Sequence, residues 1–177
     1  GVEELHNNGD NCGAGLALTY VPGPGMVITG NVGYADVDFD QDNNPGATDD
    51  YSGVDAMLST RFRTSESLQH VIYGRYGSDH QVVGPAYNFS EQLELGYGIA
   101  LDIIKDLTLR GDIAWLQIDE SDDGEEADVY RGSIGASYAV SIKTSVSASY
   151  TRTEKDSDFA NREYEKNTFR LTVSHRF

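Results

Sequence analysis

Apolar and polar residues alternate with a period of two along most of this chain, and no other feature restricts its fold as strongly. From Leu93 to Ile103 every odd-numbered residue is aliphatic or aromatic, and the residues between them are Glu, Gly, Ala or Asp. Successive side chains of a β-strand point to opposite faces, so such a segment has one apolar and one polar face. The same pattern recurs at 54–63, 107–115, 130–140 and 146–151. We therefore predict an all-β protein.

The connections between the predicted strands alternate in length. Nine strands are expected, at 13–21, 26–37, 52–63, 68–76, 93–103, 107–118, 129–140, 145–153 and 167–177. Short turns at 22–25, 64–67, 105–106 and 142–144 alternate with long polar segments at about 38–50, 77–92, 119–128 and 154–166. Short turns at one end and long loops at the other are typical of bacterial outer-membrane barrels. No apolar run approaches the ~20 residues of a transmembrane helix, so a membrane span would have to consist of strands.

The last predicted strand carries a family resemblance. Phe169, Leu171, Val173 and Phe177 alternate with polar residues and end on an aromatic side chain. This segment resembles the signal that the outer-membrane barrel assembly machinery reads, and residues 13–177 are similar in plan to small OmpX/OmpA-type barrels and porins of Gram-negative bacteria. The resemblance implies an antiparallel transmembrane β-barrel of eight to ten strands after a polar N-terminal segment, 1–12. It also implies an outer-membrane location, with a periplasmic C-terminus and extracellular long loops.

An odd strand number predicts that the barrel is incomplete. Bacterial single-chain barrels normally have an even number of strands. Counting back from a periplasmic Phe177 makes the strand at 13–21 start on the extracellular side. We therefore expect that the nine strands do not close a barrel alone. The alternatives are a first strand outside the wall, an unusual odd closure in which it pairs with 167–177, an upstream strand absent from this chain, or a larger parent barrel. Gly1 is then a processed mature end or the start of a fragment.

Acidic residues dominate the charge of the chain. The net charge of -16 excludes nucleic acid as an expected partner, because phosphate binding depends on clustered Lys and Arg. Acidic residues gather in the predicted loops, where carboxylates could bind divalent cations. The weak metal candidates are Asp38, Asp40, Asp42, Asp122 and Asp123. The simpler interpretation is a solvated anionic surface without any cofactor, which contacts outer-membrane lipid and lipopolysaccharide through divalent ions.

Charged residues also occur on the polar side of the strands, which would face the lumen of a barrel. They must be paired or hydrated there, since an isolated buried charge is very unfavourable. Pairing is the structural interpretation, and a charged constriction that selects small solutes is the functional one. These predicted lumen charges are Asp55, Arg61, Arg63, Arg75, Glu94, Asp102, Arg110, Asp112, Arg131 and Arg170.

Catalysis is not expected. Asp79 and His80 adjoin each other near a strand end, where omptin-type barrel proteases hold Asp and His groups, but neighbouring residues of a strand point to opposite faces. Cys12 cannot form an internal disulfide because it is the only cysteine. The expected function is a structural or surface-interaction role, with a protein partner or oligomer. A cation-preferring, porin-like channel for small solutes is the alternative, and a barrel hydrolase is a minor one.

Overall fold

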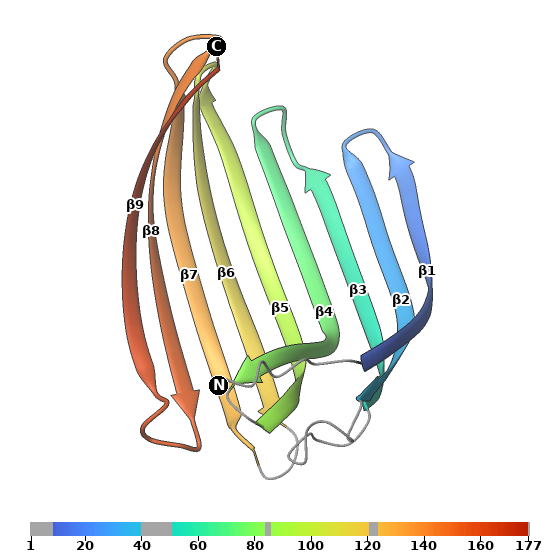
Figure 1. Cartoon of the computed structure of the whole chain (residues 1–177). Coiled ribbons are helices and arrows are strands. Elements are labelled where there is room, and N and C mark those ends of the chain that lie inside the picture. The colour runs from blue at the N-terminus through green and yellow to red at the C-terminus, as the bar shows by residue number, and fades with distance from the viewer. Residues whose placement is uncertain (1–8, 40–50, 84–85, 121–123, 177) are drawn as a thin grey trace.

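The described residues form a single curved sheet of nine antiparallel strands (Figure 1). The computed structural model describes residues 9–39, 51–83, 86–120 and 124–176. Every strand pairs with the next one in the sequence, and no helix among the described residues is long and apolar enough to cross a membrane. The strands are β1 (Gly9–Gly23), β2 (Met26–Phe39), β3 (Tyr51–Arg63), β4 (Leu68–Val83), β5 (Ala86–Ile104), β6 (Leu107–Glu120), β7 (Glu126–Ala139), β8 (Thr144–Ser157) and β9 (Tyr164–His175).

The sheet is open, as the odd strand number predicted. Within the described residues β1 pairs only with β2, and β9 pairs only with β8. These two strands lie at opposite edges of the sheet in Figure 1. The prediction of nine antiparallel strands that do not close among themselves is confirmed.

One predicted loop is wrong. The segment 77–92 was expected to be a long polar connection, but the pairing of β4 with β5 continues from Gly77 opposite Gln92 to Val83 opposite Ala86. A β-ladder is made of backbone hydrogen bonds, so polar side chains on both faces do not end it. The other three long connections are also shortened, because strands β2, β6 and β8 end at Phe39, Glu120 and Ser157.

The short turns lie where the sequence placed them. The tightest ones join β1 to β2 and β5 to β6. Gly25 in the first of these has a φ of 85°, a conformation that favours glycine over residues with a Cβ. At the N-terminal side the first strand is longer than expected: it begins at Gly9, opposite Phe39, rather than at Gly13. Part of the predicted polar segment 1–12 is therefore strand.

The register of the eight strand pairs gives the sheet two faces of opposite character. Residues that lie directly opposite each other in an antiparallel pair share a face. We call the face that carries Trp115 the apolar face. Its exposed side chains include Leu16, Leu18, Val32, Val54, Leu58, Ile72, Leu95, Ile99, Ile113, Ile134, Phe169, Leu171 and Val173. We call the opposite face, which carries Arg131, the polar face; Gly, Ser, Thr and charged residues predominate there.

This single layer has no conventional core. Among the described residues the only buried hydrophobic side chains are Ala114 and Ala127. Ile113 and Ile134 are 64% and 66% exposed on the apolar face. Contiguous exposed apolar surface of this extent is unfavourable in water, so the apolar face requires an apolar environment.

Candidate functional site

The polar face gathers all ten charged residues that were predicted to face a lumen. The strand register places every one of them on the same side as Arg131. Short residues separate some of them: Gly96, Gly98 and Ala100 lie between Glu94 and Asp102 on this face of β5. Charged side chains therefore lie over the sheet with little to cover them.

Glu94 organises the centre of this face. Arg131 on β7 reaches across β6 to Glu94 on β5, with 3.0 Å between Nη2 and Oε1. The path is open because Ala114, the β6 residue opposite Arg131, is small. Tyr73 on β4 also donates a hydrogen bond of 3.0 Å to Glu94. The Tyr73 ring lies over Gly96, where a Cβ would collide with the ring. Glycine at this position thus lets the tyrosine lie flat on the sheet.

Two further carboxylates of the polar face accept hydrogen bonds from hydroxyl groups. Thr108 donates to Asp102 at 2.6 Å, and Ser133 donates to Asp112 from the directly opposite position. Asp55 lies so close to Gly77 that a Cβ on this glycine would meet the carboxylate. Among the described residues, the prediction that the lumen charges pair with each other therefore holds for Glu94 and Arg131 but not for Asp55, Asp102 and Asp112.

Five arginines of the polar face have no carboxylate partner within the described part of the chain. These exposed residues are Arg61, Arg63, Arg75, Arg110 and Arg170. Arg75 lies directly opposite Glu94 in the register, yet the Glu94 carboxylate pairs with Arg131. A guanidinium without a counter-ion requires water, because the desolvation of an unpaired charge is prohibitive.

A second cluster, which the sequence did not predict, joins two connections at the long-loop end of the sheet. We call Glu120, Glu125, Lys155, Ser157 and Arg162 the loop cluster. The side chain of Glu125 is 4% exposed and pairs with Lys155 at 2.6 Å and with Arg162 at 3.2 Å. Ser157 donates a hydrogen bond of 2.5 Å to the same carboxylate, and Arg162 also pairs with Glu120 at 3.0 Å. The cluster ties the β8–β9 connection to the β6–β7 connection.

Acid is expected to loosen the loop cluster. Burial by itself would raise the pKa of Glu125, but hydrogen bonds from Lys155, Ser157 and Arg162 outweigh it and lower this pKa. A carboxyl group with a lowered folded-state pKa stabilises the folded loops above its unfolded value of about 4.3. That stabilisation is lost as the pH falls through the folded-state pKa.

NMR spectra recorded over a range of pH would test this prediction. The amide of Phe159 donates a hydrogen bond to Ser157, and the amide of Arg162 donates one to Phe159, so the signals of these two amides report on the order of the loop. We expect them to broaden or shift below about pH 4. Glu125→Gln, which removes the charge, should show the loosened signals at pH 7. Unchanged signals in both cases would contradict the role of the Glu125 charge.

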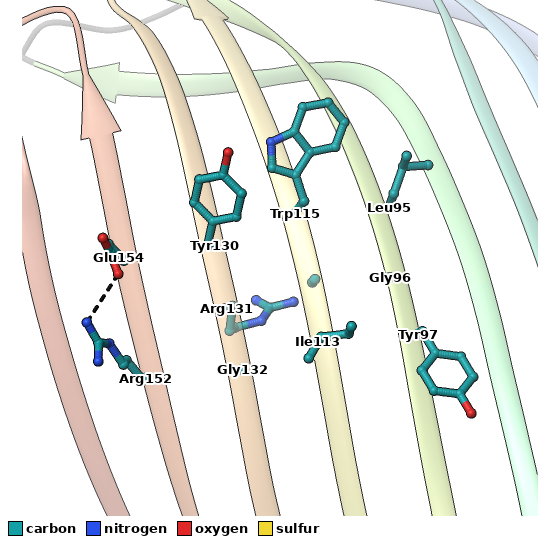
Figure 2. A pocket seen from close by; sticks show the side chains of 11 residues that line it. Leu95, Gly96, Tyr97, Ile113, Trp115, Tyr130, Arg131, Gly132, Arg152 and Glu154 are labelled. Atoms are coloured by element: carbon teal, nitrogen blue, oxygen red, sulfur yellow. Dashed lines mark hydrogen bonds and ion pairs between the residues drawn. The ribbon is translucent and has the colours of Figure 1, made fainter.

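The apolar face has aromatic residues toward its long-loop end. Trp115 and Tyr130 lie opposite each other on β6 and β7 (Figure 2), and Trp115 donates a hydrogen bond of 2.9 Å to Asp128. Next to them Gly132 leaves a hollow of about 540 Å³, since no atom lies within 4 Å of the position of a Cβ there. Arg152 at its rim pairs with Glu154 at 3.2 Å, as Figure 2 shows. Such an arrangement suits the boundary between hydrocarbon and polar headgroups.

The remaining predicted site residues are only partly described. The side chain of Asp38 and the whole of Asp40, Asp42, Asp122 and Asp123 lie outside the described residues, so the metal site at these residues stays a prediction. The described residues contain no group of three or more potential metal ligands. The side chain of His80 and residue Phe177 also lie outside the described part. Phe169, Leu171 and Val173 are on the apolar face, 80%, 74% and 65% exposed.

Comparison with known sequences identifies a family. The model of the outer membrane protein β-barrel domain matches residues 11–177. No curated protein sequence matches the chain.

Comparison with solved structures finds the same fold in outer-membrane proteins. The outer membrane channel DcaP of Acinetobacter baumannii is 16% identical, with a TM-score of 0.68 over 99% of this chain and 55% of that one. OmpT, an outer membrane protein of Vibrio cholerae, is 8% identical, with a TM-score of 0.61 over 93% of this chain and 55% of that one. At these identities the likeness concerns the fold alone. This chain spans about half the length of both structures.

Proposed function

Because this chain belongs to the family of outer-membrane β-barrel domains, we propose that its nine strands form part of the wall of a channel for small polar solutes. The observation that carries the proposal is the set of exposed arginines without counter-ions on the polar face. A dry, side-chain-filled barrel interior would leave these charges desolvated. A water-filled lumen keeps them hydrated, so the polar face fits an aqueous passage better than a packed interior.

The open sheet supports the proposal that these strands belong to a wide barrel with more than nine strands. The diameter of a barrel grows with the number of its strands, and only large barrels leave an aqueous channel. Nine strands that run side by side without closing represent a part of such a wall. Edges left unpaired in lipid would expose backbone groups that each require a hydrogen-bond partner, so further strands are expected to complete the wall. One similar structure that is longer than this chain is described as a channel.

The orientation follows from the connections. We propose that the short turns and the C-terminus face the periplasm and that the longer connections face the cell exterior, as in bacterial barrels. The apolar face would contact outer-membrane lipid, and the acidic connections would contact lipopolysaccharide through divalent ions. Phe169, Leu171 and Val173 would then belong to the segment that the assembly machinery recognises. We propose no resident cofactor.

Single-channel recording tests the channel function. The native protein, inserted into a planar lipid bilayer, is expected to give stable stepwise increases in current. The same preparation, unfolded before addition, is the control and should give none. A folded protein that inserts but never conducts would refute the channel.

A surface-interaction role is the second candidate, and the loop cluster favours it. Buried ion pairs between the two connections hold an ordered surface at the long-loop end, which a purely passive pore would not require. An inserted but silent protein would favour this role. We propose no catalytic function; a hydrolase would require turnover that disappears in His80→Ala.

A further inference from the structure

Three arginines of the polar face share one line across the sheet. The register runs from Arg63 on β3 to Arg110 on β6 and on to Arg170 on β9, through directly opposite residues. The residues between them on this line are Gln69, Ala100, Gly135 and Ser149. We propose that these three arginines, here called the arginine ladder, bind small solutes that carry a carboxylate or phosphate group and give the channel a preference for anions. The inference rests on the proposed channel function.

The spacing makes the arginine ladder a series of separate sites. Neighbouring arginines are three strands apart in the sheet order, which is roughly 14 Å at about 4.8 Å for each strand. Strands of membrane barrels tilt by about 40°, so a line perpendicular to them climbs along the pore, here by roughly 9 Å for each step. An anion would therefore pass from one guanidinium to the next while it moves along the pore. Conduction requires several binding sites of this kind rather than one tight site.

The arginine ladder has no counter-ion among the described residues. Three carboxylates of the same face have other partners: Glu94 pairs with Arg131, and Asp102 and Asp112 accept hydrogen bonds from Thr108 and Ser133. Ala100 and Gly135, which flank Arg110 on the line, are too short to cover it. The three guanidinium groups thus remain accessible to a solute.

The distribution of charge also favours anions at the polar face. The chain has a net charge of -16 but contains 13 lysines and arginines. Eight of these lie on the polar face within the strands: Arg61, Arg63, Arg75, Arg110, Arg131, Lys155, Lys166 and Arg170. Arg131 and Lys155 pair with Glu94 and Glu125, so six of the eight have no ion-pair partner among the described residues. The carboxylates with described side chains on the same face of the strands are fewer: Asp55, Glu94, Asp102, Asp112 and Glu120. This preference for anions is the opposite of the cation-preferring channel that the sequence analysis gave as the alternative function. Selectivity depends on the charges nearest the solute, however, because salt screens charges more than about 10 Å away.

Arginine suits this task chemically. Its planar guanidinium stays protonated and offers a fork of donors that matches two oxygens of a carboxylate or phosphate. A lysine at the same position would supply charge without the fork. The ladder should therefore discriminate between oxyanions and chloride as well as between anions and cations.

The test measures the reversal potential of the native protein in a planar bilayer under a KCl gradient. We expect the protein to favour chloride over potassium. The triple variant Arg63→Gln, Arg110→Gln and Arg170→Gln should lower the anion-to-cation permeability ratio by about threefold or more, the effect of removing a unit charge near the path of an ion in water. The control is Lys105→Gln, Lys143→Gln and Arg176→Gln, which removes the same charge from the short-turn end and should change the ratio less.

A variant that keeps the charge but replaces arginine by lysine tests whether the two-donor geometry of the guanidinium matters. Inorganic phosphate added to one side should reduce the chloride current through the native protein, and Arg63→Lys, Arg110→Lys and Arg170→Lys should weaken this block while keeping the anion preference. Variants that keep the heat-modifiable gel mobility of the native protein are folded. Absence of any current in the native protein would refute the channel itself. Stable current with a cation preference, or a ratio that the triple glutamine variant leaves unchanged, would overturn the arginine ladder alone.

Discussion

Replacement of Ile134 by Arg is expected to destabilise the folded barrel by about 2–4 kcal/mol, the cost of a lipid-facing arginine near the bilayer midplane. Ile134 is 66% exposed and lies in the middle of the apolar face of β7, opposite Tyr150 on β8. A guanidinium at this depth cannot reach either interface without distortion of the lipid. Urea titration of the protein folded in liposomes would measure the loss.

The neighbouring residue provides the control. Ser133 lies on the polar face, directly opposite Asp112. Ser133→Arg should change the free energy of unfolding by less than about 1 kcal/mol, since the new charge is hydrated and can pair with the carboxylate. Equal destabilisation by the two substitutions would show that the two faces have been assigned the wrong environments.

Replacement of Glu125 by Ala should release the β8–β9 connection from the β6–β7 connection and make it less ordered. The substitution leaves Lys155, whose side chain is 14% exposed, beside a cavity and without its carboxylate partner. Removal of one partner of a buried ion pair destabilises the surrounding structure by about 3 kcal/mol. Hydrogen exchange at Glu120 and Asp158, whose amides bond to the backbone of Glu125 and Glu126, should accelerate by about a hundredfold.

Glu126→Ala is the matched control. Glu126 is adjacent and exposed, and its backbone amide donates to Asp158 whatever its side chain is. Its substitution should leave exchange at both amides close to that of the native protein. Exchange in Glu125→Ala that is equally slow would mean that the ion pairs contribute nothing to the order of this connection.

Local chemistry was sufficient to predict the strands and their faces. A strand exposes alternate side chains whatever its partner is, so the sequence of β5 or β7 already separates an apolar from a polar face. Short turns were also predictable, since glycine and polar residues such as Gly25 mark them within a few residues. The odd number of strands followed from the same pattern, and with it the expectation that the sheet would remain open.

Contacts between strands were not predictable in this way, because they depend on register. Period two places Glu94 and Arg131 on the same face, but it does not say how β5, β6 and β7 are aligned. Their ion pair depends on that alignment and on a small residue, Ala114, between them. The segment 77–92 was misassigned for a different reason: its two halves, 77–83 and 86–92, pair with each other through the backbone, and this pairing does not require alternating apolar side chains.

The sequence by itself determined the fold class, the strand number and the character of each face, all of which arise from the geometry of single strands. Only the tertiary structure decided which charges meet. Glu125 and Arg162 are 37 residues apart, and no local pattern connects them. The arginine ladder likewise depends on seven strands in one register. Both arrangements result from backbone hydrogen bonds between strands, which hold side chains from distant parts of the chain at fixed positions across the sheet.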